Sequence, residues 1–168
     1  SDEMMGDPDL WSGCISGALR EDQFLQAFEE AGFYGVQILK LDENPWQTVE
    51  GIEFRGMTIE AFKAEQGIHL DRNQSVIYKG PFKKVIGDDD HPMERGKRYA
   101  VSDLTYRLYR KAPYAGFFEF IDPRGEVAAD QAEPFASDET RLRHPRESKG
   151  KDYRDSTRAT ECCGPDCC

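Results

Sequence analysis

The sequence lacks several features that would identify a cofactor-binding, nucleic-acid-binding or membrane protein. No G-x-G run occurs in its 168 residues, so the glycine-rich turn that cradles a nucleotide cofactor is missing. No apolar run approaches the length of a membrane span, and the acidic start, Ser1-Asp2-Glu3, is unlike a signal peptide. The net charge is −10, whereas nucleic acids and anionic lipids bind basic surfaces. We therefore expect a cytoplasmic protein that binds neither nucleic acid nor membrane.

Cysteine is almost absent from the body of the chain. Only Cys14 lies outside the last seven residues, which hold Cys162, Cys163, Cys167 and Cys168. Disulfides within so short a segment would close almost no loop and would add little stability. The odd total of five cysteines and their crowding therefore favour reduced thiols that bind a soft metal over a disulfide framework.

Hydrophobic residues are also scarce, at 38% of the chain against 32% charged residues. This composition predicts a folded domain followed by a solvated segment. Apolar residues become sparse from about residue 125. We expect one domain over residues 1–124 and an extended, cysteine-tipped arm over residues 125–168.

The apolar residues that are present follow helical and strand periods in alternation. Asp7 and Asp103 are expected helix caps, and Gly32 and Pro113 are expected helix stops. The predicted fold class is α+β, an antiparallel β-sheet with two or three helices and an extended C-terminal arm. The expected helices cover residues 8–14, 21–31 and 103–112, and the expected strands cover residues 36–41, 52–62, 75–79, 81–86, 96–101 and 117–121, with 81–86 and 96–101 as partners.

Small residues surround Cys14 just before the second expected helix. Such neighbours allow close approach of other groups, and a thiol near a helix N-terminus is a candidate for a lowered pKa. The other interpretation is a buried, inert cysteine that fills space as a small hydrophobic residue. Residue spacing leaves both interpretations open.

The cysteine cluster at residues 162–168 has a second interpretation too. Two adjacent pairs offer enough sulfur for arsenic, zinc or Cu(I), but the C-x2-C spacing of a structural zinc site is missing. A redox-sensitive tail without a metal is the alternative.

The remaining candidate ligands are histidines. His91 follows three aspartates in the segment 87–92, which could hold a hard metal ion or form a solvated turn. The segment lacks the spacing of a calcium loop and its closing glutamate. His69 and His144 have no suitably spaced partners, and we expect them to be ordinary surface residues.

Four segments resemble one protein family in the correct order. Residues 10–19, LWSGCISGAL, resemble the L-W-G-x-C-x-G-G-A-L segment of the arsenite S-adenosylmethionine methyltransferases, with Ser12 and Ser16 in place of glycine. Residues 54–63, FRGMTIEAFK, and residues 74–80, QSVIYKG, are similar to two later segments, and the cysteine-rich end is the fourth. The resemblance is strong over about residues 7–80.

The resemblance implies roles for particular parts of the chain. It implies that Cys14 is one of the thiolates that hold trivalent arsenic, as arsenite or methylarsenite. Residues 7–63 would correspond to the last helix and closing strand pair of a class I methyltransferase plus the arsenic-binding loop, and residues 68–121 to an additional β-rich part. Partner thiolates and the S-adenosylmethionine site would belong to a catalytic domain before residue 1. The cluster Cys162, Cys163, Cys167 and Cys168 could add thiolates or capture arsenite.

The expected function is thus the arsenic-binding C-terminal portion of an arsenite methyltransferase, inactive on its own. The alternative is a stand-alone, thiol-based carrier of arsenite or another soft metal without methyltransferase activity. A redox-responsive interaction module that uses the tail thiols is a third possibility. The sequence gives no indication of the oligomeric state.

Overall fold

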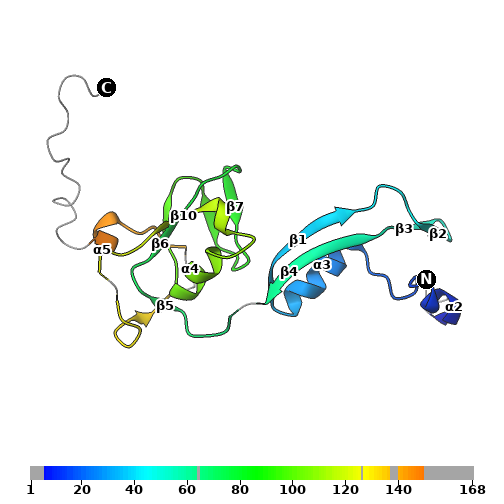
Figure 1. Ribbon diagram of the computed structural model, residues 1–168, viewed down its shortest axis with the longest axis horizontal. Helices are drawn as coiled ribbons and strands as arrows, with labels where there is room; N and C mark the ends of the chain where they lie inside the picture. The colour runs from blue at the N-terminus through cyan, green and yellow to red at the C-terminus, as the bar shows by residue number, and fades with distance from the viewer. Residues whose placement is uncertain (1–5, 64, 126, 137–139, 150–168) are drawn as a thin grey trace, which may run out of the picture. The chain divides into compact units, whose positions relative to one another are not determined.

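The computed structural model describes residues 6–63, 65–125, 127–136 and 140–149 (Figure 1). The chain divides into two compact units, Ser1–Ala64 and Glu65–Cys168. Both units combine short helices with antiparallel strand pairs, so the predicted α+β class is confirmed. Within the described ranges, no helix has both the length and the apolar character needed to cross a bilayer.

The first unit begins with helix α2 (Pro8–Ser12), which starts where the sequence predicts. The Asp7 carboxylate accepts hydrogen bonds from the backbone N–H groups of Asp9 and Leu10, at 2.8 and 3.2 Å. Pro8 occupies the first helical position, where its missing N–H group costs nothing. This cap explains how so short a helix holds a fixed start.

Helix α3 (Glu21–Glu30) packs on a two-stranded antiparallel sheet of β1 (Phe33–Leu41) and β4 (Met57–Lys63) (Figure 1). The Phe28 ring on the helix meets the Phe33 ring on the strand, with centroids 5.6 Å apart. The apolar face that the sequence predicts for residues 21–31 is therefore the face that joins helix to sheet.

The single strand expected over residues 52–62 is divided in two. β2 (Gln47–Val49) and β3 (Ile52–Phe54) form a hairpin around Glu50 and Gly51, whose φ angles are 50° and 82°. Positive φ at both turn residues is the geometry of a tight hairpin turn. β3 therefore pairs with β2, while β4 pairs with β1, and the prediction of one continuous strand is wrong.

The first unit buries little of its apolar surface. Among its described residues, only Ile15, Ser16, Tyr34 and Gly35 are buried. A two-stranded sheet is marginally stable in water unless a further surface covers it. Seven large apolar side chains stay exposed in this unit: Trp11, Leu19, Ile38, Leu39, Leu41, Trp46 and Ile52.

The second unit is built around β6 (Ser75–Tyr78), which lies between β9 (Arg98–Ala100) and β10 (Phe118–Ile121). Helix α4 (Asp103–Tyr109) contributes buried tyrosines to one face of this sheet. The Tyr109 ring stacks on the Phe118 ring with centroids 4.5 Å apart. The buried core consists of Val76, Tyr78, Met93, Tyr99, Val101, Tyr106, Tyr109 and Phe118.

Two details of this unit differ from the sequence prediction. The expected pairing of residues 81–86 with 96–101 is wrong: β7 (Lys84–Ile86) pairs with β8 (Pro92–Glu94), and β9 pairs with β6. A short acidic turn closes the β7–β8 hairpin, which leaves β9 to extend the central sheet. Helix α4 is capped by Ser102, not by the expected Asp103; the Ser102 hydroxyl accepts the Thr105 N–H at 3.1 Å.

The segment that follows the central sheet contacts it closely. A short 3-10 helix, η1 (Ala115–Phe117), precedes β10, and β5 (Leu70–Asp71) pairs with β11 (Glu133–Pro134). Leu142 forms a β-bridge with Tyr99, and helix α5 (Pro145–Lys149) follows it. Residues 140–149 therefore pack on the second unit, which differs from the extended arm expected there. The predicted domain limits, 1–124 and 125–168, stay a prediction.

Candidate functional site

Cys14 lies in the turn that ends helix α2. Its backbone N–H donates to the Trp11 carbonyl at 3.1 Å, and the Ile15 N–H donates to the Leu10 carbonyl at 2.8 Å. These two bonds form a helix-ending motif whose central position, here Cys14, is left-handed and usually glycine. Cys14 has φ 59°, and its side chain is exposed. The interpretation of Cys14 as a buried space-filling residue therefore does not fit the structure.

Cys14 borders an open groove of about 1000 Å³ in the first unit. One wall comes from the turn after α2 and the start of α3, and the other from β3 and the adjoining ends of β1 and β4. The lining is mostly apolar but includes two arginines and two glutamates. The lining residues are Cys14, Ile15, Ser16, Ala18, Leu19, Arg20, Glu21, Phe24, Leu41, Ile52, Glu53, Phe54, Arg55 and Met57.

Cys14 is the one cysteine among the residues that the structure describes. In these ranges, no group of three or more His, Cys, Asp or Glu side chains is arranged to hold a metal ion. The other predicted thiol ligands, Cys162, Cys163, Cys167 and Cys168, lie outside the described residues. Among its described residues, the groove thus offers one thiolate to a soft metal or to arsenic.

The architecture does not fit an S-adenosylmethionine site of the class I type. Such a site needs parallel strands joined through a glycine-rich turn to a helix. Every strand pair among the described residues is antiparallel. The described strands therefore do not form a class I type of site for the cofactor that the family resemblance implies.

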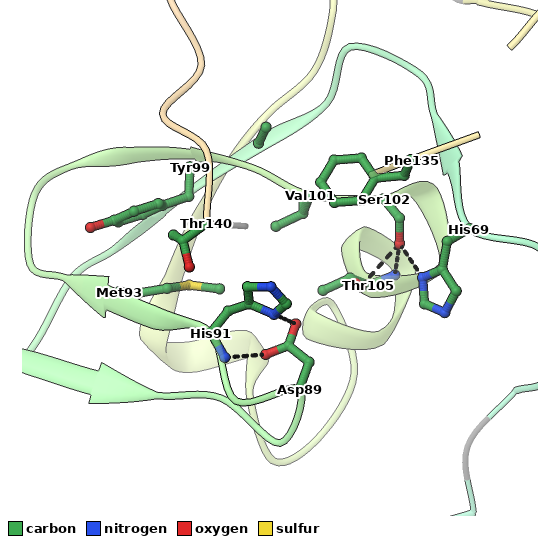
Figure 2. Close-up of a pocket in the computed structure, with 11 residues that line it drawn as sticks. His69, Asp89, His91, Met93, Tyr99, Val101, Ser102, Thr105, Phe135 and Thr140 are labelled. Atoms are coloured by element: carbon green, nitrogen blue, oxygen red, sulfur yellow. Dashed lines mark hydrogen bonds and ion pairs between the residues drawn. The ribbon is translucent and has the colours of Figure 1, made fainter. Parts of the chain in front are cut away.

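A second hollow, of about 310 Å³, lies in the second unit (Figure 2). The His91 ring faces it beside Asp89; the backbone N–H of His91 donates to one carboxylate oxygen at 3.3 Å, and Nδ1 lies 3.5 Å from the other. His69 Nδ1 lies 2.8 Å from the Ser102 hydroxyl. Sequence reasoning missed the His69–Ser102 contact because 33 positions separate the two residues and no motif links them.

The acidic turn beside this hollow is tied to helix α4 and the segment after it. The Tyr114 hydroxyl donates to the Asp88 carboxylate, and the Tyr109 hydroxyl lies close to Gly87. Burial, with the nearby negative charge of Asp89, raises the pKa of Tyr109, so its phenol stays protonated. Asp88 and Asp89 therefore have protein partners, and the turn is fixed by the tyrosines.

Gly87→Ala tests how tightly this turn is packed. An added Cβ would lie 2.7 Å from Asp89 Oδ1 and 2.8 Å from the Tyr109 hydroxyl oxygen. We expect a loss of about 1–3 kcal/mol in unfolding free energy, as for other overpacked sites. Gly116→Ala is the matched control because nothing lies within 4 Å of its added Cβ. Equal denaturant midpoints for the two variants would contradict the packing described.

Comparison with known proteins gives one family match and one distant relative. Residues 65–153, more than half of the chain, match the family described as a domain of unknown function, DUF8838. The arsenite methyltransferase of Aquipseudomonas alcaligenes is 25% identical over 133 residues, which cover 72% of this chain and 38% of that protein. The chain thus spans little more than a third of this relative, and its relationship to the methyltransferase is distant. By the match over its second unit, the chain belongs to the DUF8838 family.

Proposed function

We propose that this chain is the arsenic(III)-binding C-terminal part of an S-adenosylmethionine-dependent arsenite methyltransferase that serves arsenic detoxification. Cys14 presents a thiolate to arsenite or methylarsenite. The distant similarity to an arsenite methyltransferase supports the reaction class. The observation that carries the proposal is the exposed Cys14 side chain beside an open groove.

The backbone of Cys14 supports a role beyond packing. A residue with a Cβ in the left-handed region costs roughly 1–2 kcal/mol relative to a right-handed conformation, and glycine avoids that cost. A cysteine at such a position, with its side chain in solvent, gains no burial energy in return. Strained residues of this kind cluster at functional sites.

The chemistry of trivalent arsenic explains why a thiol is needed. Arsenic(III) is soft and prefers sulfur ligands to nitrogen or oxygen. Each thiol that binds arsenite replaces one hydroxyl group and releases one molecule of water. Cys14 supplies one of the three thiolates, and the others come from the catalytic domain or from the pairs Cys162–Cys163 and Cys167–Cys168.

The exposed apolar side chains of the first unit support a partner domain. Ile38, Leu39 and Leu41 on β1 are each about half exposed, at 47%, 58% and 50%. Seven large apolar side chains exposed in one small unit are typical of a surface that a partner covers. In the proposal, the S-adenosylmethionine-binding domain covers this surface and brings its cofactor to the arsenic held at Cys14.

The test compares the chain alone with a joined protein. Incubated with arsenite and labelled S-adenosylmethionine, the chain alone should form no methylated arsenic. Fused to the part of the Aquipseudomonas alcaligenes enzyme that it does not match, it should restore turnover. Turnover by the isolated chain, or an inactive but folded fusion, would contradict the proposal.

The crowding of four cysteines within residues 162–168 favours a second candidate function, a soft-metal carrier. Equilibrium dialysis against arsenite separates the two. A carrier that relies on the tail loses its affinity when Cys162, Cys163, Cys167 and Cys168 are changed to serine and keeps it in Cys14→Ser. In that event, Cys14→Ser should leave the rate of arsenic methylation by the fusion unchanged.

A further inference from the structure

The negative charge of the chain is concentrated in its first unit. Residues 1–64 hold 13 acidic and 4 basic residues, a net charge of −9, whereas residues 65–168 hold 19 acidic and 18 basic residues, a net of −1. The Debye length at physiological salt is about 8 Å, so distant charges scarcely weaken a local cluster. The net charge of the whole chain is therefore a poor guide to what the second unit binds.

Cations cluster at one end of the second unit, where the loop after β6 meets the turn between β8 and β9. Lys84 lies opposite Glu94 across the β7–β8 pair, and Lys97 Nζ is 2.9 Å from the Glu94 carboxylate. Arg95 donates to the Pro81 carbonyl at 3.0 Å, and the Arg95 N–H donates to the Lys83 carbonyl, also at 3.0 Å. One carboxylate thus lies among several cations.

The electrostatics of Glu94 agree with this arrangement. A hydrogen bond from Lys97, with the nearby charges of Lys97, Lys84 and Lys83, holds the pKa of Glu94 below its usual value. Glu94 is the sole acid in residues 79–86 and 94–98. Over the whole of residues 79–98, which include the three aspartates of the β7–β8 turn, six Lys or Arg residues face four Asp or Glu residues, so a net charge of +2 remains.

Large apolar side chains lie among these cations. Phe82 and Ile86 are each 67% exposed, and Phe117 is 45% exposed. On β7, Val85 packs against the core, which turns Lys84 and Ile86 to solvent. The Lys79 N–H donates to the Phe117 carbonyl at 2.8 Å, which holds Phe117 beside the start of the basic loop. We call the set the lysine patch: Lys79, Phe82, Lys83, Lys84, Ile86, Arg95, Lys97 and Phe117.

We propose that the lysine patch docks on an anionic lipid surface, with Phe82 and Ile86 entering the headgroup region and the lysines contacting lipid phosphates. Aliphatic and aromatic tips among flexible lysines suit the interface between headgroups and acyl chains. Nucleic-acid sites favour arginine and polar base readers. Residues 79–86 and 94–98 contain no Asn, Gln, Ser or Thr, and their solvent cations are mainly lysine.

The test is co-sedimentation of the full chain with vesicles. We expect binding to vesicles of phosphatidylcholine with 30 mol% phosphatidylglycerol, weak binding to phosphatidylcholine alone, and release at 0.5 M salt, because the attraction is screened. The double variant Lys83→Glu/Lys84→Glu should lower the vesicle partition coefficient at least tenfold. Phe82→Ala/Ile86→Ser should lower it severalfold without changing the charge.

A matched control carries the same charge change elsewhere in the unit. Arg146→Glu/Lys149→Glu alters helix α5, which contacts Asn73 at the opposite end of β6 from Lys79. Its partition coefficient should match the parent protein, with circular dichroism confirming that every variant is folded. No binding to anionic vesicles, equal losses in both charge variants, or tighter binding to a single-stranded oligonucleotide than to vesicles would overturn the proposal.

Discussion

Cys14→Gly should abolish arsenic methylation by the fusion described above while leaving the first unit at least as stable. The thiolate that holds arsenic is lost, so the arsenic is no longer positioned for methyl transfer. Misplacement of a reacting atom by about 1 Å already costs roughly 100-fold in rate, so we expect a loss of at least that size. Product formation from labelled S-adenosylmethionine measures it.

The stability of the same variant should change in the opposite direction. Glycine relieves roughly 1–2 kcal/mol of strain at the left-handed position, and the greater freedom of the unfolded chain offsets about 0.4–1 kcal/mol of that gain. The net expectation is a gain of up to about 1.6 kcal/mol, read from the thermal midpoint. Most substitutions destabilise a protein, so a loss of activity together with a gain in stability separates a functional role from a structural one.

Cys14→Ser is the matched control. Serine keeps the side-chain size and the strained backbone but offers a hard oxygen ligand to arsenic. It should lose activity like Cys14→Gly without the gain in stability. A fusion that methylates arsenite normally with either residue would refute the role of Cys14.

Arg143→Ala should lower the unfolding free energy of the second unit by about 3–5 kcal/mol. The Arg143 guanidinium is 1% exposed and donates to Asp71 at 2.7 Å, to Glu147 at 3.0 Å and to Asn73 at 3.2 Å. Its removal takes away the buried cation of this cluster and leaves the partly buried Asp71 and Glu147 carboxylates with the exposed Arg141 alone, and removing one partner of a buried ion pair is costly. Chemical denaturation followed by the tyrosine-rich core of this unit measures the loss.

Arg141→Ala is the control because Arg141 contacts the same two carboxylates. Its guanidinium pairs with Asp71 at 2.7 Å and with Glu147 at 3.1 Å, but its side chain is 49% exposed. Exposed pairs contribute about 0–1 kcal/mol. Equal denaturant midpoints for the two alanine variants would contradict the prediction that burial makes Arg143 contribute more than Arg141 to the unfolding free energy.

The burial of Arg143, in contrast to Arg141, could not be predicted from the sequence. Both lie in the charged stretch 141–151, which by composition cannot form a core and is predicted from the sequence to extend from the domain. Arg143 is nevertheless buried because its backbone N–H donates to the Arg98 carbonyl at 3.0 Å and its side chain donates to Asp71, 72 residues earlier. Such contacts have no local signature.

For the strands, the positions could be predicted from the sequence but the pairing could not. The positions of β1, β6 and β10 follow from local apolar residues and are close to the predicted ranges. Their partners do not follow, because pairing depends on turn geometry and on the competition of several strands for one neighbour. The Glu50–Gly51 turn and the acidic β7–β8 turn decide which strands meet.

By itself, the sequence determined the α+β class, the cap at Asp7 and the helix at residues 21–30. It also identified Cys14 as the candidate functional thiol. Periodicity, capping chemistry and residue type act over a few neighbours, so they can be read without a fold. Only the tertiary structure decided that Cys14 is exposed with a left-handed backbone, that the chain divides near residue 64 and that Arg143 is buried. Exposure, strain and charge burial depend on which distant segments come together, and that is set by packing of the whole unit.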